Sequence, residues 1–587
     1  MRQTYNLKKL FSYVLAQRGD FVKTILYGIG ATLLLLPLPM MIPLLIDQLL
    51  LHRQGKLTAF FSQYGIIEPW IIIATVLAAM TTLRIGAFVF ENKKTYHAVK
   101  ITQKIAYLLR LHILHRLEYV SLNAYASLKT GGITSKNVQD VESISAFVGQ
   151  ATTTLLSSLL MLLGVGAVMM WMNWVLALLV LLINPFTFAF SKLLGRKTAK
   201  LLKKRHEAYQ IYNELLTETL ELMMQVRASN REHAFFGNLR QKAKEMERVS
   251  LAYSYKVAVT QGASTLLTQT TVDLFRALGI AAVLYSDLSI GMMIGFLFYM
   301  ATLVQPMNRL SALVMAYQRI QPAINRINTL LVLEREPSYL HKKDPFYNQK
   351  SVSIKVENVH FAYADAKTVL HGVSLYAKAG EKVAIVGPSG SGKSTVAQLL
   401  VGLYPLCQGN ICYGGVSISD IGLSHLRAHV ALMLQHPLFF NDTIRMNLTL
   451  NTPKSDEEIF AALHAAQLGV FVSSLEKGLE TRIGKHGIRL SGGQRQRLAI
   501  ARLILSDPKV VIFDEATSAL DNALEECLYE TLEVFLKGRT TIIVAHRTST
   551  IRQADRIYVM ENGRVTAHGS YEALQKAKWL KEDFDDE

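Results

Sequence analysis

Cysteine is the rarest residue in this chain of 587 residues, with only three occurrences. All of them, Cys407, Cys412 and Cys527, lie in the second half of the chain. A reducing cytosol would keep such thiols in the reduced state. We therefore expect neither disulfide bonds nor a metal bound by cysteine.

The N-terminus lacks the features of a secretory signal. It stays polar and mixed up to about Phe21, without a short apolar core and small residues for cleavage. The first long apolar stretch is therefore expected to remain in the protein. Residues 5–18 carry apolar side chains at helical spacing. This spacing predicts a helix that either lies along the inner membrane surface or leads directly into the first span.

Composition points to a membrane part joined to a water-exposed part. Half of the residues are hydrophobic and 18% are charged, and the mean hydropathy is +0.22. A chain of this length should also hold at least two domains. No repeat or low-complexity tract was found in the sequence.

Acidic residues are outnumbered, and the net charge is +18. Such an excess would suit nucleic acid, anionic lipid or basic loops on the cytoplasmic side of a membrane. The segments 47–68, 172–174 and 285–289 carry few positive residues. Basic residues instead crowd between apolar stretches, for example Lys192, Arg196, Lys197, Lys200, Lys203, Lys204 and Arg205. This asymmetry follows the positive-inside rule, so we expect no nucleic-acid partner.

Six apolar stretches are long enough to cross a bilayer as helices of about 20 residues. They run near 22–46, 69–90, 149–171, 174–194, 257–284 and 289–311. Prolines 37, 39 and 43 should kink the first. The connections 91–148 and 195–256 are long and have helical periodicity, so the spanning helices are expected to continue into the cytoplasm and turn at a tip. An even number of spans places both termini on the same side, the cytoplasmic one.

The pattern of apolar and polar residues changes after residue 335. We expect a membrane domain over 1–335, a polar linker over 336–350 and an α/β domain over 351–587, because short apolar strands alternate there with helical stretches. The expected fold class is thus a membrane α-helical domain of six long helices with cytoplasmic extensions, plus an α/β P-loop domain.

A phosphate-binding loop follows the predicted strand 383–386 and precedes a helical stretch, which is the context that a P-loop requires. Its glycines let backbone N–H groups surround phosphates, the lysine reaches the β and γ oxygens, and the following serine hydroxyl binds Mg²⁺. The loop consists of Gly387, Pro388, Ser389, Gly390, Ser391, Gly392, Lys393, Ser394 and Thr395.

Two carboxylates, Asp514 and Glu515, end the apolar strand 510–513. In a parallel sheet this places them beside the phosphate loop. Asp514 is expected to hold Mg²⁺ through water, and Glu515 to orient and deprotonate the attacking water.

A second phosphate-binding element lies between these motifs, at Leu490, Ser491, Gly492, Gly493 and Gln494. A helix that opens with Ser-Gly-Gly offers a hydroxyl, backbone N–H groups and a positive dipole end. These groups suit the far side of a terminal phosphate. Since the P-loop already covers the near side, the pentapeptide indicates a site that one chain cannot complete.

Together these motifs make the second half resemble an ATP-binding cassette, and the whole chain resembles an ABC half-exporter of the multidrug and lipid-flippase type. The resemblance covers essentially all residues. It identifies Leu490 to Gln494 as the family signature. It further implies a glutamine loop at Gln435, a D-loop at Ser518, Ala519, Leu520 and Asp521, a switch histidine at His546 and an adenine-stacking Tyr363.

The resemblance implies a head-to-tail pair of cassettes with two ATP molecules between them. Ser491 of one chain would meet the γ-phosphate held by Lys393 of the other. Catalysis would then rest on Glu515, His546 and Gln435, with ATP and Mg²⁺ as cofactors and Ser394, Gln435 and Asp514 around the metal. Because no catalytic position is altered, we expect a homodimer, although a heterodimer stays open.

One segment departs from the family pattern. Exporters usually carry an acidic stretch before the signature, whereas this chain has Arg482 and Lys485 there. Two interpretations stay open: a tolerant exposed loop, or a contact of reversed polarity with acidic helix tips such as Glu232.

Charges inside spans are costly and mark candidates for a substrate path. The charged candidates are Arg84, Asp273 and Arg276, with the polar Gln269 nearby, although Asp273 and Arg276 are spaced to pair with each other. Met293, Phe296 and Met300 could line the substrate path with polarizable apolar side chains, or they could simply pack against neighbouring helices.

The sequence therefore predicts ATP-driven export or flipping of a small amphipathic substrate across the cytoplasmic (inner) membrane, in contact with membrane lipid. An exporter of a peptide or a glutathione-type conjugate is an alternative. From another class, an ATP-gated channel or regulatory subunit would use the same parts, but the intact Glu515 favours turnover.

Overall fold

A computed structural model of the chain gives the fold. It describes all residues except 1–3, 52–54, 65–67, 127–135, 286–287, 364–366, 436, 485–486, 515–530, 546–547, 578 and 580–587, and it leaves out the side chains of further residues, mainly 181–197. The chain forms two compact units. A helical unit comprises Met1–His115 and Gly131–Val332, and an α/β unit comprises Arg116–Thr130 and Leu333–Glu587.

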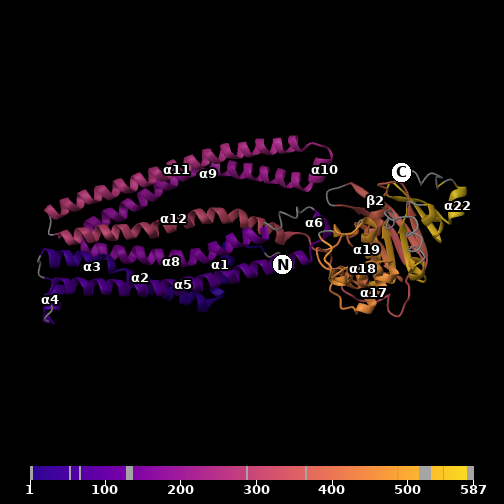
Figure 1. Cartoon of the computed structure of the whole chain (residues 1–587), viewed down its shortest axis with the longest axis horizontal. Helices are drawn as coiled ribbons and strands as arrows, with labels where there is room; N and C mark the ends of the chain where they lie inside the picture. Colours follow the sequence, from indigo (N-terminus) through magenta and orange to yellow (C-terminus); the bar gives the residue numbers. More distant parts are fainter. Residues whose placement is uncertain are drawn as a thin grey trace. The chain divides into compact units, whose positions relative to one another are not determined.

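The helical unit consists of long helices, four of which have more than 40 residues (Figure 1). Its elements are α1 Leu7–Ala16, α2 Arg18–Leu35, α3 Leu38–Leu45, the π-helix Ile46–Leu50, α4 Lys56–Gln63, α5 Pro69–Glu118, a second π-helix Lys136–Asp140, α8 Val141–Met172, α9 Trp174–Glu221, α10 Met223–Ala228, α11 Glu232–Tyr285 and α12 Ile290–Val332. The helix expected over 5–18 is thus present as α1.

Within the described residues, five helical segments are long and apolar enough to cross a membrane: Arg18–Leu50, Pro69–Glu118, Val138–Met172, Glu232–Tyr285 and Ile290–Val314. The other expected span, 174–194, is part of the helix α9. Most of its side chains lie outside the described set, so its membrane crossing stays a prediction. The predicted continuation of the second span as a helix is confirmed, because α5 continues without a break for 50 residues, or about 75 Å. Its cytoplasmic location stays a prediction.

The prolines of the first span break the helix, as expected. α2 ends at Leu35 and α3 begins at Leu38. The break leaves backbone carbonyls without helical donors, and a neighbouring helix supplies one, because Tyr299 of α12 donates its hydroxyl hydrogen to the carbonyl of Leu36 at 2.9 Å.

α9, α10 and α11 form a long hairpin (Figure 1). The predicted tip at 228–230 is confirmed, since α10 ends at Ala228 and Asn230 adopts a left-handed φ of 52° before α11 begins. The other predicted tip, at Gly131 and Gly132, lies outside the described residues. Several apolar side chains of this hairpin are more than 40% exposed: Leu222, Met224, Phe235, Leu251 and Tyr255.

Two sheets build the α/β unit. The six-stranded sheet has the order β10-β9-β3-β8-β7-β6 and is parallel except for β10. Its strands are β3 Lys382–Val386, β6 Val430–Met433, β7 Val510–Asp514, β8 Thr540–Val544, β9 Arg556–Glu561 and β10 Arg564–Gly569. The antiparallel sheet has the order β2-β1-β4-β5, with β1 Ile354–Ala362, β2 Thr368–Ala377, β4 Gln408–Tyr413 and β5 Val416–Ser417.

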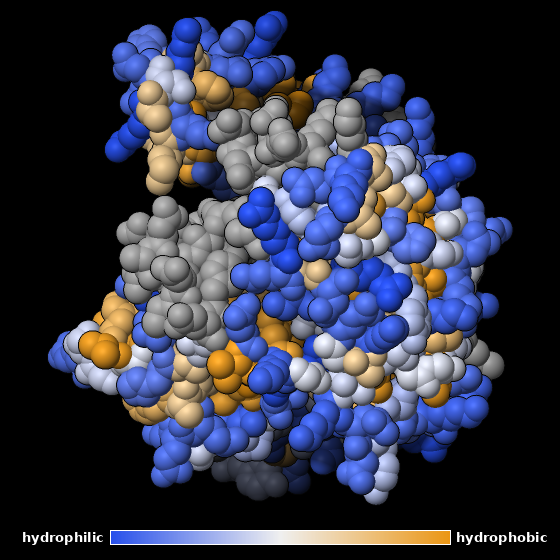
Figure 2. Space-filling model, turned by 90° about the vertical axis from the view of Figure 1, so that its right-hand side faces the viewer, coloured by the Kyte–Doolittle hydropathy of each residue, from blue (hydrophilic) through white to orange (hydrophobic). Residues whose placement is uncertain are grey.

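Two large buried clusters form much of the core of this unit. One joins both sheets to α13 (Lys393–Leu400) and α15 (Leu423–His429), and the other joins α17 (Asp456–Ala465), α18 (Gly469–Ser474) and α19 (Gly492–Ser506). The short helices α6 (Leu122–Ala126), α14 (Ile418–Ile421), α16 (Ile444–Thr449), α21 (Thr548–Arg552) and α22 (Tyr571–Lys576) and the 3-10 helix Gly478–Glu480 complete the described part. On the side where Figure 1 shows α22, hydrophilic residues dominate the surface in Figure 2.

The segment predicted as a polar linker, 336–350, belongs to the α/β unit. The backbone N–H of Ser121 donates to the carbonyl of Glu334, and that of Glu336 donates to the carbonyl of Tyr119. Residues 119–121, just beyond α5, thus form a short antiparallel pair with residues 334–336. This pairing explains why residues 116–126 belong to the α/β unit, although the sequence-based limits place them in the membrane domain.

Candidate functional site

The predicted P-loop connects the central strand β3 to α13. Gly387, Gly390 and Gly392 have φ values of 147°, 79° and 98°, a region that side chains other than glycine rarely adopt. A β-carbon on Gly387 would lie 2.0 Å from the carbonyl oxygen of Met560. Only glycine therefore fits where this loop passes β9.

Lys393 begins α13 and points back into the loop. Its ammonium group donates hydrogen bonds to the carbonyl oxygens of Gly387 at 2.7 Å and Pro388 at 3.0 Å. The side chain is almost fully buried, so its positive charge lies inside the phosphate-binding loop.

Ser394 and Asp514 meet although they come from different elements. The Ser394 hydroxyl donates to the carboxylate of Asp514 at 2.8 Å. Asp514 ends β7, which is separated from β3 by β8 alone in the sheet order. A hydroxyl and a carboxylate in contact form an oxygen donor set of the kind that Mg²⁺ prefers.

A further hydroxyl in the loop favours a phosphate ligand. Ser391 is 3% exposed, and its Oγ has no hydrogen-bond partner among the described residues. A buried hydroxyl without a partner is costly. A phosphate oxygen would satisfy it.

Tyr363 lies directly after β1, beside the first turns of α13. Its hydroxyl is 3.1 Å from the hydroxyl of Thr395 and donates to Oε1 of Gln398 at 3.1 Å. The structure therefore brings the predicted adenine-binding ring to the helix that carries the phosphate loop.

The signature sequence begins α19, as expected. Ser491 is the N-cap, and its Oγ accepts a hydrogen bond from the N–H of Gln494 at 3.2 Å, while Oε1 of Gln494 accepts one from the N–H of Ser491 at 2.8 Å. This reciprocal capping box leaves Ser491 exposed at a helix N-terminus. Such an end is a binding site for an anion.

The roles of several other site residues stay predictions. Gln435 follows β6 and is half-buried. Glu515, the D-loop 518–521, His546, Lys485 and the thiol of Cys527 lie outside the described residues. Among the described residues, Cys407 and Cys412 are free thiols.

Comparison with known proteins decides the family. A family model of the ABC transporter transmembrane region matches residues 33–307, and a model described as ABC transporter matches residues 370–518. An uncharacterized ABC transporter ATP-binding protein of Bacillus subtilis, YwjA, is 31% identical over 98% of this chain and 97% of its own length. The chain belongs to the ABC transporter family.

Two other relatives have names that state a function. The ATP-dependent lipid A-core flippase of Legionella pneumophila (strain Paris) is 32% identical over 82% of this chain and 81% of its own length. The putative multidrug export protein YgaD of Bacillus subtilis is 30% identical over 97% of both chains. A bacterial Atm1-family ABC exporter solved with ATP bound has the same fold, with a TM-score of 0.79, 24% identity and coverage of 98% of this chain and 100% of that chain.

This ABC transporter is therefore a multi-pass membrane protein with an ATP-hydrolysing cassette, and it has the exporter fold. The names of the two relatives describe ATP-dependent flipping of lipid A-core and multidrug export.

The helical unit of the transporter contains a cavity of about 760 Å³. Apolar side chains such as Leu35, Met80 and Phe298 form much of its wall. Polar and charged groups share it: Arg84, Glu91, Lys94, Ser158, Gln305 and Arg309. Lys94 is 6% exposed and forms an ion pair with Glu91 at 2.5 Å, so these two charges compensate each other. The positive charges of Arg84 and Arg309 therefore remain without a compensating charge among the described residues of the wall.

Of the predicted path residues, Arg84 alone lines this cavity. Asp273 and Arg276 pair with each other at 2.9 Å, and both are more than half exposed on α11, where Gln269 is also exposed. Phe296 and Met300 are buried, and Phe296 stacks on Phe275 at 5.6 Å, with Met293 packed against the same cluster. Packing thus accounts for these three side chains.

Sequence reasoning missed three residues that the geometry adds, and it interpreted a fourth, Arg309, as a side chain that snorkels at the end of the sixth span. In the cavity these are Gln305 and Arg309, which share a face of α12 with Phe298 and Thr302. The spacing of Phe298, Thr302, Gln305 and Arg309 at three and four residues was the available signal. In the cassette they are Gln398 and Tyr404, both in contact with Tyr363.

Proposed function

We propose that this transporter works as a homodimer in the cytoplasmic (inner) membrane, with both termini in the cytoplasm, and moves a small amphipathic molecule with an anionic head group outward. The cavity of the helical unit carries this proposal, since it combines an apolar wall with Arg84 and Arg309. An apolar body would contact the wall. The arginines would bind the head through charge-assisted hydrogen bonds.

An unpartnered hydroxyl supports a polar head in the same cavity. Ser158 is 2% exposed, and its Oγ has no hydrogen-bond partner among the described residues. A head-group oxygen or N–H would satisfy it. The alternative of a peptide or a glutathione-type conjugate predicts a longer polar substrate, which the apolar wall favours less.

ATP binding is assigned to the residues of the P-loop. Lys393 and the backbone N–H groups would hold the β- and γ-phosphates, and Ser391 would contribute its buried hydroxyl. Ser394 would hold Mg²⁺ through its hydroxyl and Asp514 through water, and the metal would supply positive charge next to the phosphates. Tyr363 would stack on adenine, and Glu515 would act as the base toward water.

The signature supports a dimer. Ser491 and the N-terminus of α19 would complete the γ-phosphate site of a second copy, because the exposed capping box presents backbone N–H groups and a dipole. The exposed apolar side chains of the α9–α11 hairpin, with Met224 at 85%, also require a partner or lipid.

The substrate assignment is tested by ATPase stimulation in proteoliposomes. Two amphiphiles with the same tail, one with an anionic head and one with a neutral head, are compared. The anionic amphiphile should stimulate the ATPase activity at a lower concentration than the neutral one. Arg84→Gln and Arg309→Gln should raise the half-maximal concentration of the anionic amphiphile about tenfold. Arg276→Gln, outside the cavity, is the matched control. Equal stimulation by both heads would contradict the proposal.

Measuring vectorial transport distinguishes a pump from an ATP-gated channel. Glu515→Gln should bind ATP and stall, with hydrolysis at least about 100-fold slower. A pump then loses all outward movement of a fluorescent amphiphile. A channel keeps a downhill flux when ATP is bound, and this result would favour the alternative class.

A further inference from the structure

Three aromatic rings form a contiguous cluster next to the ATP site. Tyr363 meets Tyr404 edge to face, with ring centroids 5.3 Å apart and an interplanar angle of 86°. Phe361 contacts both, at 4.9 Å from Tyr363 and 5.7 Å from Tyr404. Edge-to-face pairs have a preferred geometry, so each ring restricts the tilt of its neighbours.

The hydroxyl end of Tyr363 is fixed as well. It contacts Thr395 and donates to Gln398, both on α13. Tyr363 is therefore held at its ring by Tyr404 and at its tip by Gln398. Neither Tyr404 nor Gln398 belongs to the sequence motifs to which ATP binding is assigned.

Tyr404 itself depends on the loop that follows α13. Gly402 turns this loop with a φ of 67°. Arg427 of α15 donates to the carbonyls of Val401 at 3.3 Å and Gly402 at 2.6 Å. The same guanidinium pairs with both carboxylate oxygens of Glu336, at 2.5 and 3.2 Å.

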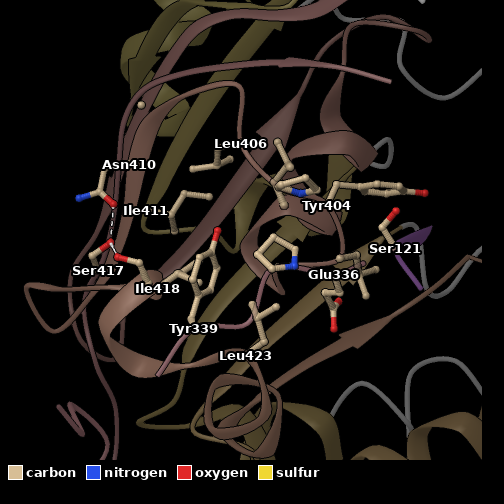
Figure 3. Close-up of a pocket in the computed structure, with 17 residues that line it drawn as sticks. Ser121, Glu336, Tyr339, Tyr404, Leu406, Asn410, Ile411, Ser417, Ile418 and Leu423 are labelled. Carbon is tan, nitrogen blue, oxygen red and sulfur yellow. Dashed lines mark hydrogen bonds between the residues drawn. The ribbon is translucent and has the colours of Figure 1, made fainter. Parts of the chain in front are cut away.

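Behind Tyr404 lies a pocket of about 240 Å³ within the α/β unit (Figure 3). Figure 3 shows Tyr404, Ser121 and Glu336 on one side and Asn410, Ser417 and Ile418 on the other. Since this space borders Tyr404, part of the tyrosine lacks packing partners there. The ring is therefore positioned by its aromatic neighbours and by the loop that Arg427 anchors. Burial raises the pKa of Tyr404, which keeps the phenol neutral.

We propose that Tyr404 and Gln398 are positioning residues for adenine recognition: they fix the ring of Tyr363 in the orientation that stacks on the base of ATP. This inference rests on the proposed role of Tyr363. Its physical basis is preorganisation, because a stacking ring that is already oriented loses less rotational freedom when ATP binds. The inferred role concerns the base, so we expect phosphate binding to stay unchanged when the ring loses its orientation.

The test compares ATP with ribose 5-triphosphate, which keeps the phosphates but has no base. In full-length reconstituted transporter, Tyr404→Leu should raise the KM for ATP about 3- to 10-fold. The kcat for ATP and the KM for ribose 5-triphosphate should stay within about twofold. Tyr404→Phe keeps the ring and should behave as the unmodified chain. Equal rises for both substrates would show a general packing defect and overturn the proposal.

Gln398→Leu provides a second variant that leaves Tyr404 in place. It should also raise the KM for ATP selectively, because the Tyr363 hydroxyl loses one of its two partners. An unchanged KM for ATP in both variants, with a raised KM in Tyr363→Leu, would overturn the positioning role alone. An unchanged KM in Tyr363→Leu would overturn the adenine role on which it rests.

Discussion

Glycine at single positions decides whether the phosphate loop can form. Gly387 lies so close to β9 that a methyl group has no room, whereas a methyl group on Gly390 would have no other atom within 4 Å. Both have φ values that strain other residues. An alanine at Gly390 would thus meet backbone strain alone, whereas an alanine at Gly387 would meet both backbone strain and a steric clash.

Gly387→Ala should lower the free energy of unfolding by about 1–3 kcal/mol beyond the strain of its backbone. Gly390→Ala should suffer the strain alone, about 1–2 kcal/mol. Thermal unfolding of the two variants, with and without ATP, measures the difference. Equal melting temperatures would show that the carbonyl of Met560 moves away readily.

At the scale of elements, the first span depends on its neighbour. Its proline break frees the carbonyl of Leu36, and the hydroxyl of Tyr299 satisfies it. Inside a membrane no water replaces a lost donor, so the bond contributes to the fit of α12 against the first span.

Tyr299→Phe should destabilise the transporter by about 1 kcal/mol, because it removes this donor and keeps the ring. Thermal unfolding in detergent is the measurement. Tyr317→Phe, on the same helix but 46% exposed, should leave the melting temperature unchanged. A loss of the same size in both variants would contradict the role of the hydroxyl.

Two helices of the cassette each begin with a capping box of the same type. Comparing the same substitution in both helices distinguishes an effect on folding from an effect on catalysis. Ser455 caps α17 through Glu458 as Ser491 caps α19 through Gln494. Aspartate caps a helix about as well as serine. Only at position 491 would the added negative charge face a phosphate.

Ser491→Asp should therefore keep the melting temperature and lower ATPase activity by at least about 100-fold, as expected for removal of an anion site. Ser455→Asp should keep both. Measuring both quantities on both variants completes the comparison. An active Ser491→Asp transporter would remove the signature from the phosphate site.

For the whole molecule, the head-to-tail arrangement predicts complementation. A chain with Lys393→Ala and a chain with Ser491→Asp each give homodimers in which both sites carry a defect. In the mixed dimer, one site combines two damaged residues and the other is intact.

Mixed dimers purified through two different tags should therefore recover ATPase activity well above that of either homodimer. Activity is measured at equal protein concentration, with each homodimer as the control. Mixed dimers as inactive as both homodimers would contradict sites shared between two chains.

Sequence patterns were sufficient where chemistry is local. The P-loop, the strand ending at Asp514 and the helix opening at Ser491 each depend on a few consecutive residues, and the structure has all three. Patterns in the membrane part were weaker, because an apolar helix does not reveal which face packs. Phe296 and Met300 fit a substrate wall by composition, yet they are buried against α11.

The sequence by itself determined the two-part organisation, the long helices and the ATP-binding motifs, since periodicity and short motifs act within a few turns of chain. Only the tertiary structure decided which distant residues meet. It placed Ser394 on Asp514, Tyr404 on Tyr363, and Arg309 in one cavity with Arg84. These contacts depend on sheet order and helix packing, which burial of apolar surface sets for the whole unit rather than residue by residue.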